Sequence, residues 1–477
     1  MGPRIQRQLD FKDDKSNRRP AMSWLDHLIM LLHIGAEIEH GLMVQYLYAA
    51  YSLGGDGVPK EHRPMVQRWQ DSIITVAKEE MGHLLTVQNV LTLLGAPINL
   101  DRENFPWDVQ YYPFAFNLEP LNLQSLSRFV FAEMPAEMEL SKWPNMDQEE
   151  IARIIAKARE NVTRGQPHRV GAVYGEIIEL LKDKTRIPDS AFNERSYDNQ
   201  QDWDDWGRSY HPDAKLLTVD GSLDKKAKSR PPGDEARVLI DRVATRAEAV
   251  KALEALSEQG EAPHLGTSDK THELSHFQRF AEIFEEFENI GYRWDPVRGV
   301  PTNPTTFARK DAGNIGDFIE AQHSRHWGDL FNLRYRMLLM YLAHTFRLAR
   351  STRRDTPSAR GMMMHKVFGE MYNLKAIAGI LVRLPLTDKP GDARRAGPPF
   401  EIPYTLVLPP TEMDAWRLHA DLLDTAAELR DELLHSDVKD PPEGEAYLKT
   451  LGDLDDQSKS WVDSVFAALG AAERLTV

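Results

Sequence analysis

The stretch Glu79-Glu80-Met81-Gly82-His83 lies inside the apolar run 71–94 and decides the fold predicted for this chain. Glu80 and His83 are three residues apart, so on a helix their side chains lie one turn apart on the same face. A second pair with the same spacing, Glu273 and His276, follows much later in the chain. Two Glu-x-x-His pairs in one helical chain are typical of a dinuclear metal site inside a helix bundle.

The composition narrows the kinds of site that the chain can hold. With 477 residues, of which 42% are hydrophobic, it can bury a large core. It has no cysteine, which excludes disulfides, thiolate catalysis, iron–sulfur clusters and zinc sites built from cysteine. Any metal ion must therefore be held by glutamate, aspartate or histidine side chains, by the backbone or by water.

The charge and the N-terminal sequence bear on partners and location. The net charge of −15 argues against a nucleic-acid partner, which would favour a basic surface. Residues 1–20 lack the apolar segment of a signal peptide. The apolar stretch 24–53 carries Asp26, Glu37 and Glu39, too many charges for a membrane span. We therefore expect a cytoplasmic protein without a membrane partner, and the sequence indicates no particular oligomeric state.

Helical periodicity dominates the chain and strand patterns are almost absent, so we predict an all-α fold. Residues 1–20 should form a flexible arm, residues 21–292 a four-helix bundle with a polar insertion near 185–235, and residues 293–477 a helical region packed on the bundle. The expected helices span residues 24–53, 63–94, 125–133, 147–162, 169–181, 236–257, 269–290, 316–350, 360–384, 411–434 and 443–475.

The first two long helices each place one glutamate of a Glu pair on an apolar stripe. Glu39 aligns with apolar residues at spacings of three, four and seven, whereas Glu37 falls on a more polar side. Glu80 likewise shares an apolar stripe with His83, and Glu79 is rotated off it. A carboxylate on a core stripe is costly to bury unless it is paired or bound to a metal. Glu39, Glu80 and His83 are therefore ligand candidates, and a Glu39 held by an arginine or tyrosine is the alternative.

The remaining ligands are expected from later helices. The stripe over 169–181 favours Glu176, while Glu179 and Glu133 are alternatives. Glu273 and His276 precede an aromatic stripe that should face the core. The full set of four glutamates and two histidines matches that of di-iron and di-manganese bundles, and this donor set favours iron, or manganese as the alternative, over copper or structural zinc. The predicted metal ligands and catalytic residues are Glu39, Glu80, His83, Glu176, Glu273 and His276.

Several stretches resemble one known family. They are 37–53, 77–95, Ser127-Arg-Phe-Val-Phe-Ala-Glu-Met-Pro135, Ser257-Glu-Gln-Gly-Glu261 and Ser275-His-Phe-Gln-Arg-Phe280. They are similar to motifs of the ferritin-like family that contains the iminophenyl-pyruvate dimer synthases of bis-indole pigment biosynthesis. The resemblance covers most of residues 22–401, and it implies a ferritin-like bundle. The best-known members are much longer and couple two oxidised aromatic amino acids.

Matching positions in that family imply that Glu39, Glu80, His83 and His276 are metal ligands, and more loosely Glu273. Glu261 would be a ligand or a group that supports one. Where members often have Gly-Glu-x-Tyr in the third helix, this chain has Gly171-Ala172-Val173-Tyr174. The third-helix ligand therefore does not follow from the resemblance.

These observations predict a di-iron enzyme: an oxidase or oxygenase that acts with dioxygen on a small amino-acid-derived substrate, with two iron ions per chain. Met43, Tyr46 and Tyr174 are candidates for its substrate pocket, or ordinary core residues. One alternative is imine or oxidative dimerisation of aromatic amino-acid derivatives, as in the resembling family. Another is a ferritin-like metal-binding protein without catalytic activity, and a third is a helical scaffold with vestigial ligands.

Overall fold

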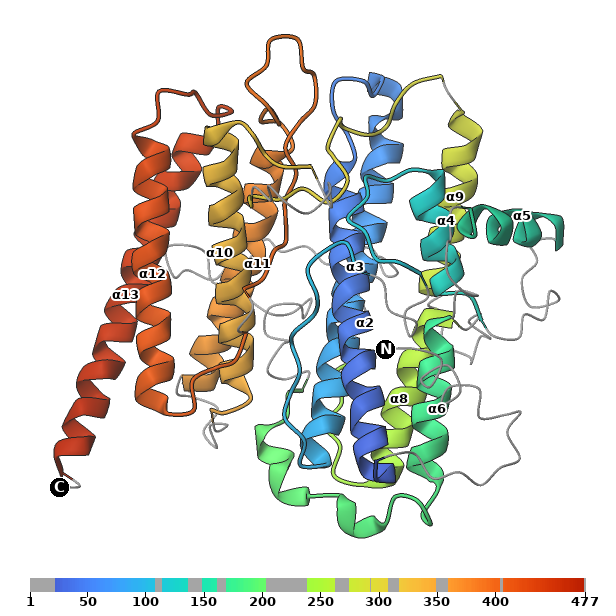
Figure 1. Cartoon of the computed structure of the whole chain (residues 1–477), viewed down its shortest axis with the longest axis vertical. Coiled ribbons are helices and arrows are strands. Elements are labelled where there is room, and N and C mark those ends of the chain that lie inside the picture. Colours follow the sequence, from blue (N-terminus) through green and yellow to red (C-terminus); the bar gives the residue numbers. More distant parts are fainter. Residues whose placement is uncertain are drawn as a thin grey trace, which may run out of the picture.

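The computed structural model describes residues 22–107, 114–135, 148–160, 169–202, 238–261, 274–291, 293–307, 317–348, 359–403 and 406–475. Within these ranges the ordered elements are helices, and β-pairing is limited to isolated bridges such as that between Leu53 and Val297. The all-α prediction is confirmed, as is a helix bundle with an additional C-terminal helical region (Figure 1). The expected N-terminal arm, residues 1–20, lies outside the described ranges.

Two long antiparallel helices form the centre of the bundle. Helix α2 (Trp24–Ser52) begins at Ser23, whose side chain accepts a hydrogen bond from the Asp26 amide at 3.0 Å. It ends before Gly54 and Gly55, whose positive φ angles turn the chain into α3 (Arg63–Leu93). The two helices pack along their lengths (Figure 1). Because α3 is buried on every side from Glu79 to Leu91, it runs through the interior of the protein.

Four shorter helices complete the bundle (Figure 1). Helix α4 (Leu123–Ala132) packs on α9 (His276–Ile290), and α6 (Val170–Lys182) packs on α8 (Arg246–Glu261). Helix α5 (Gln148–Ala158) lies against α4. The C-terminal ends of α4 and α8 lie close to the N-terminal ends of α6 and α9, beside α3. The candidate site lies where these four helix ends come together.

The C-terminal region consists of α10 (Gln322–Thr345), α11 (Ala359–Leu381), α12 (Glu412–Leu434) and α13 (Gly444–Leu475). Helix α10 packs on α11 and α12, and α13 packs on α12 (Figure 1). Arg334 of α10 is fully buried and pairs with Glu370 of α11 and Asp455 of α13. This buried ion network connects three of the four helices.

Polar contacts join the C-terminal region to the bundle. The Tyr335 hydroxyl of α10 donates to Nε2 of His40 on α2, and both side chains are buried. Arg102 donates to the Phe400 carbonyl and lies over the Tyr335 ring. Asn104 forms two hydrogen bonds of 2.9 Å with the backbone at residue 402. The expected boundary at residue 292 stays a prediction.

Three helices begin six or more residues later than the sequence predicted, and one of them is α10, which was expected from residue 316 and begins at Gln322. The helix expected over 236–257 spans Arg246–Glu261, preceded by a non-helical segment at 238–243 that packs on α3. A Cβ at Gly82 of α3 would lie 2.8 Å from the Leu239 carbonyl oxygen, so only glycine permits this approach. The helix expected from residue 269 begins at His276, because Ser275 caps it through a reciprocal capping box with Gln278.

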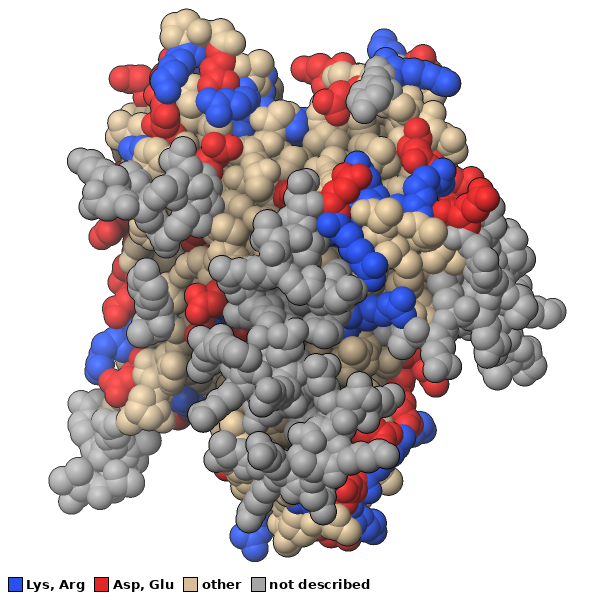
Figure 2. All heavy atoms as spheres, turned by 45° about the vertical axis from the view of Figure 1, so that its right-hand side comes forward, with Lys and Arg blue, Asp and Glu red and all other residues tan. Residues whose placement is uncertain are grey.

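The surface carries mixed charge. Figure 2 shows acidic and basic side chains interspersed over the described part of one face, with no single-sign patch. Within the described ranges, every helix is too short or too polar to cross a membrane.

A buried histidine pair in the C-terminal region predicts acid sensitivity. His344 Nδ1 lies 2.8 Å from His419 Nε2, and burial lowers the pKa of His419 to about 3, with the nearby His344 adding to this. Because the unfolded chain binds a proton near pH 6.5, the folding stability should fall as pH drops from about 6.5 towards 3. The free energy of unfolding is measured by urea titration at a series of pH values. In His419→Gln we expect its slope against pH to be smaller than in the unaltered protein by up to about 1.4 kcal/mol per pH unit. An unchanged slope would contradict this assignment.

Candidate metal centre

Helix α3 supplies the central residues of the cluster. Glu80 is 1% exposed and His83 is 4% exposed, one turn apart on a helix that is buried on all sides. From the other side of the bundle, His276 is fully buried at the first position of α9. Metal-ligating atoms of these three residues all lie within 4.8 Å of one another.

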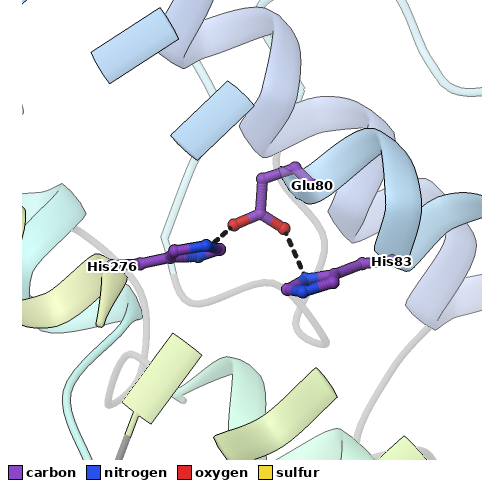
Figure 3. Close-up of side chains that lie close together, drawn as sticks. All are labelled: Glu80, His83 and His276. Atoms are coloured by element: carbon purple, nitrogen blue, oxygen red, sulfur yellow. Dashed lines mark hydrogen bonds and ion pairs between the residues drawn. The ribbon is translucent and has the colours of Figure 1, made fainter. Parts of the chain in front are cut away.

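The Glu80 carboxylate lies between the two imidazole rings (Figure 3). Its Oε2 is 3.0 Å from His83 Nδ1, and its Oε1 is 2.7 Å from His276 Nδ1. The contact to His276 is not aligned as a hydrogen bond, so Glu80 Oε1 and His276 Nδ1 have no hydrogen-bond partner among the described residues. Glu80 is thus placed to bridge two positions, one beside each imidazole.

Each of these two positions has one further glutamate. The His83 half of the cluster (His83 and Glu39) and the His276 half (His276 and Glu133) have similar contacts. Glu39 Oε2 of α2 lies 3.6 Å from His83 Nδ1, and Glu133 Oε2 at the end of α4 lies 3.6 Å from His276 Nδ1. The outer oxygen of each glutamate accepts a hydrogen bond from a buried tyrosine, Tyr174 on Glu39 and Tyr46 on Glu133. The tyrosines fix the orientation of both carboxylates.

The outer nitrogen of each imidazole is also held. His276 Nε2 lies 3.0 Å from Glu79 Oε2, and His83 Nε2 lies 3.0 Å from Gln259 Oε1 of α8. Because both oxygens accept a hydrogen bond from Nε2–H, each imidazole directs Nδ1 towards the centre of the cluster. Such outer contacts set the tautomer and ring orientation of a metal-binding histidine.

Without metal, the cluster holds protons on the imidazoles and on one carboxylate. Burial would lower the pKa of His83, but Glu80 and Glu39 outweigh it and raise it to about 10. Glu80 in the same way raises the pKa of His276 against the effect of burial. Burial and the neighbouring Glu80 raise the pKa of Glu39 to about 8. Glu80 itself stays ionised, because the two imidazoles outweigh burial and lower its pKa.

A pocket opens beside the His83 half of the cluster. Its cavity volume is about 20 Å³, which is room for about one water-sized molecule. Gly260 lies close to the cluster: a Cβ there would be 3.1 Å from Glu133 Oε2. The pocket wall is formed by Glu39, Leu42, Glu80, His83, Glu133, Val170, Gly171, Tyr174, Leu256, Ser257 and Gly260.

The structure brings together some of the residues predicted as ligands. Glu39, Glu80, His83 and His276 meet in the cluster, and Glu133, an alternative in the sequence prediction, joins them. Glu273 lies outside the described residues, as does the side chain of Glu261. Helix α9 begins at His276, and Glu273 stays a predicted ligand.

Two other candidates on α6 lie away from the cluster. Glu176 Oε1 is 3.3 Å from Nε2 of His27, which precedes Glu39 on α2 by about 18 Å of helix. Glu179 is exposed on the outer surface of α6. Glu133, from the end of α4, occupies the place expected for a third-helix ligand.

The predicted pocket residues divide in a similar way. Tyr174 lines the pocket and donates to Glu39. Tyr46 is buried behind Glu133, with its ring against Phe129 and Phe280. Met43 is a core residue that is absent from the described pocket wall.

The sequence reasoning missed Glu79 and Gln259. Glu79 was expected to point away from the core, yet it is 2% exposed and contacts His276. An apolar stripe identifies inward-facing residues only where the opposite face of the helix is exposed to solvent. This part of α3 is buried on every face. Gln259 lies within the Ser257–Glu261 motif, so the motif was the available signal.

The donor set fits a pair of metal ions. Three carboxylates and two imidazole nitrogens converge in a buried site, and Glu80 Oε1 and His276 Nδ1 have no hydrogen-bond partner among the described residues. Hard oxygen donors with two nitrogens favour iron or manganese. Glu80 Oε1 and His276 Nδ1 form an ion pair at 2.7 Å, and both become available to a metal ion when the imidazole loses its proton.

Comparison with known proteins places the chain in a family. A family model described as Ferritin-like matches residues 32–285, more than half of the chain and all of the elements that form the cluster. The chain belongs to the ferritin-like family. This ferritin-like assignment confirms the resemblance seen in the sequence.

The chain is also similar to two individual proteins. Dichlorochromopyrrolate synthase from Lentzea aerocolonigenes is 26% identical over 412 residues, which cover 79% of this chain and 36% of that protein. The chain thus spans about a third of the length of this curated relative. A solved ferritin-like protein from Caulobacter vibrioides matches with a TM-score of 0.36 and 14% identity, over 75% of this chain and 98% of that one.

Substitutions of Glu133 and Glu176 should separate the two candidates for the remaining ligand. In Glu133→Gln we expect one of two metal ions to be lost, because the amide is a weaker donor beside His276. In Glu176→Gln we expect unchanged metal content, because Glu176 contacts His27 instead. Elemental analysis of protein loaded anaerobically with Fe²⁺ measures both. Retention of both ions in Glu133→Gln, with loss in Glu176→Gln, would contradict the arrangement described above.

Proposed function

We propose that this chain is a dinuclear metal oxidase or oxygenase that acts with dioxygen on a small amino-acid-derived substrate. Iron is the proposed metal and manganese the alternative. The observation that carries the proposal is the Glu80 carboxylate, which faces Nδ1 of both His83 and His276. A bridging carboxylate with one imidazole and one further glutamate on each side supplies both imidazoles and three of the four carboxylates of a dinuclear carboxylate centre.

The residues of the chain have separate roles in this proposal. Glu80 would bridge the two ions, and Glu39 and Glu133 would complete one side each. Tyr174 and Tyr46 hold the outer oxygens of those glutamates, which limits their movement. When bound and reduced, the ions supply the electrons that activate dioxygen. The pocket beside His83 and Glu39, with a cavity volume of about 20 Å³, would give dioxygen access to the ions.

The similarity to a synthase favours an enzyme over a storage protein. It also supports a second candidate function, an imine or oxidative dimerisation of aromatic amino-acid derivatives. The chain spans only about a third of that relative, so its substrate is not carried over. A metal-binding protein without catalytic activity is less well supported, because the similar curated protein is a synthase.

Anaerobic reconstitution tests the proposal. Metal-free protein is loaded with Fe²⁺ or Mn²⁺, freed of excess metal and analysed for bound ions. Oxygen uptake is then measured with and without individual aromatic amino acids, and products formed under ¹⁸O₂ are analysed by mass spectrometry. We expect about two ions per chain and uptake that depends on the substrate. A label in the product indicates an oxygenase, and a doubled product mass without label indicates coupling. Full metal loading with no substrate-dependent uptake would instead favour the metal-binding protein.

A further inference from the structure

The two halves of the cluster differ in what holds the outer nitrogen of the histidine. The contacts that face the centre are closely matched: each Nδ1 lies 3.6 Å from its own glutamate, and each glutamate has a tyrosine on its other oxygen. On the outer side, His276 meets the carboxylate of Glu79, whereas His83 meets the neutral amide of Gln259. These two outer partners therefore differ by one negative charge.

The surroundings increase the effect of this charge. His276 is 0% exposed and the Glu79 side chain is 3% exposed, so little solvent screens the interaction between them. His83 borders the pocket, and His276 is absent from its described wall. A carboxylate on the outer nitrogen raises the donor strength of a ligating imidazole, and loss of such a partner typically costs 10–100-fold in metal affinity.

We propose that Glu79 and Gln259 make the two metal positions unequal. The position between His276, Glu133 and Glu80 fills first and holds its ion tightly. The position between His83, Glu39 and Glu80 fills second, and its ion exchanges with the pocket. Glu79 and Gln259 are positioning residues that act through the imidazoles. This inference rests on the two-metal site of the proposed function.

A functional division follows from the difference. The ion beside His276 would stay bound through turnover and keep Glu80 and Glu133 in place. The ion beside His83 would be the exchanging one, because its imidazole lines the pocket, whereas the position beside His276 contributes only carboxylates to the described wall. Ligand exchange would then take place chiefly at the His83 position.

Titration of the metal-free full chain with Mn²⁺ under anaerobic conditions tests the inference. Free Mn²⁺ is followed by EPR and the heat of binding by calorimetry. For the unaltered protein we expect two steps whose dissociation constants differ by about 10-fold or more. In Glu79→Gln the tight step should weaken by about 10-fold or more, with the weak step unchanged. In Gln259→Glu the dissociation constant of the weak step should fall towards that of the tight step.

Further variants identify the positions. Glu39→Gln should remove the weak step and keep the tight one, whereas Glu133→Gln should remove the tight step. Glu285→Gln, an exposed glutamate on α9, is the matched control and should leave both steps unchanged. Anomalous scattering from crystals grown with one equivalent of Mn²⁺ should place the ion beside His276. Circular dichroism confirms that each variant is folded.

Three results would overturn the inference while leaving the proposed function intact. They are two ions bound with equal affinity, an equal weakening of both steps in Glu79→Gln, and loss of the tight step in Glu39→Gln. Failure of the folded, unaltered chain to bind Mn²⁺ or Fe²⁺ would overturn both proposals. The two failures are therefore distinguishable in one set of titrations.

Discussion

Replacing Glu80 with alanine is expected to remove both metal ions from the protein. Glu80 is the one described residue whose carboxylate oxygens reach Nδ1 of both His83 and His276, at 3.0 and 2.7 Å. Without it, each position keeps one imidazole and one glutamate, too few ligands for a tightly held ion. We expect the affinity for both ions to fall by more than about 100-fold, beyond the loss caused by removing an outer partner. Elemental analysis after anaerobic Fe²⁺ loading measures this effect.

Two comparisons make the Glu80 result interpretable. Glu80→Gln keeps the shape of the side chain and removes the charge, so it separates lost ligation from a cavity. Glu179→Gln changes a glutamate on the outer surface of α6 and should keep full metal content. If Glu80→Ala and Glu80→Gln each retain one firmly bound ion, Glu80 is not the bridge.

Replacing Arg334 with methionine is expected to destabilise the C-terminal region by about 3–5 kcal/mol. Arg334 is fully buried, and its guanidinium donates to both oxygens of Asp455 and to Glu370 Oε1 at 3.2 Å. Its loss leaves two carboxylates buried without their counter-charge, and burial already raises the pKa of Glu370. Urea unfolding followed by circular dichroism measures the change.

The chain offers controls for the Arg334 experiment. Lys449 forms an exposed pair with Glu445 at 2.7 Å, and Lys449→Ala should change stability by less than about 1 kcal/mol. Adding Glu370→Gln and Asp455→Asn to the Arg334 variant should recover part of the loss, because the stranded charges are removed. No recovery would show that packing, and not charge, dominates at this position.

The sequence predicted the two central helices well, for a physical reason. Helices α2 and α3 are long, with strong end signals at Ser23 and at Gly54 and Gly55. The periodicity of α2 also separated Glu39 from Glu37, because Glu37 lies on the more exposed side. Where a helix has one face towards solvent, its apolar stripe indicates which side chains point inward.

The same reasoning could not assign the residues whose position depends on tertiary structure. The stripe on α3 wrongly set Glu79 aside, because that part of the helix is buried on every side. Glu133 ends α4, and only the crossing of α4 with α9 brings it to His276. Glu176 and Glu133 are both plausible in sequence, and the packing of α6 against His27 on α2 distinguishes them.

The contact between His40 and Tyr335 has a consequence for attempts to make a smaller version of this protein. Glu39 and His40 are neighbours on α2. Glu39 contributes to the metal cluster, and His40 accepts a hydrogen bond from the Tyr335 hydroxyl of α10. A chain shortened after α9 would leave His40 and Arg102, now buried, without these partners and in contact with water. A minimal bundle would therefore require redesign of that face, with both side chains replaced by groups that tolerate solvent.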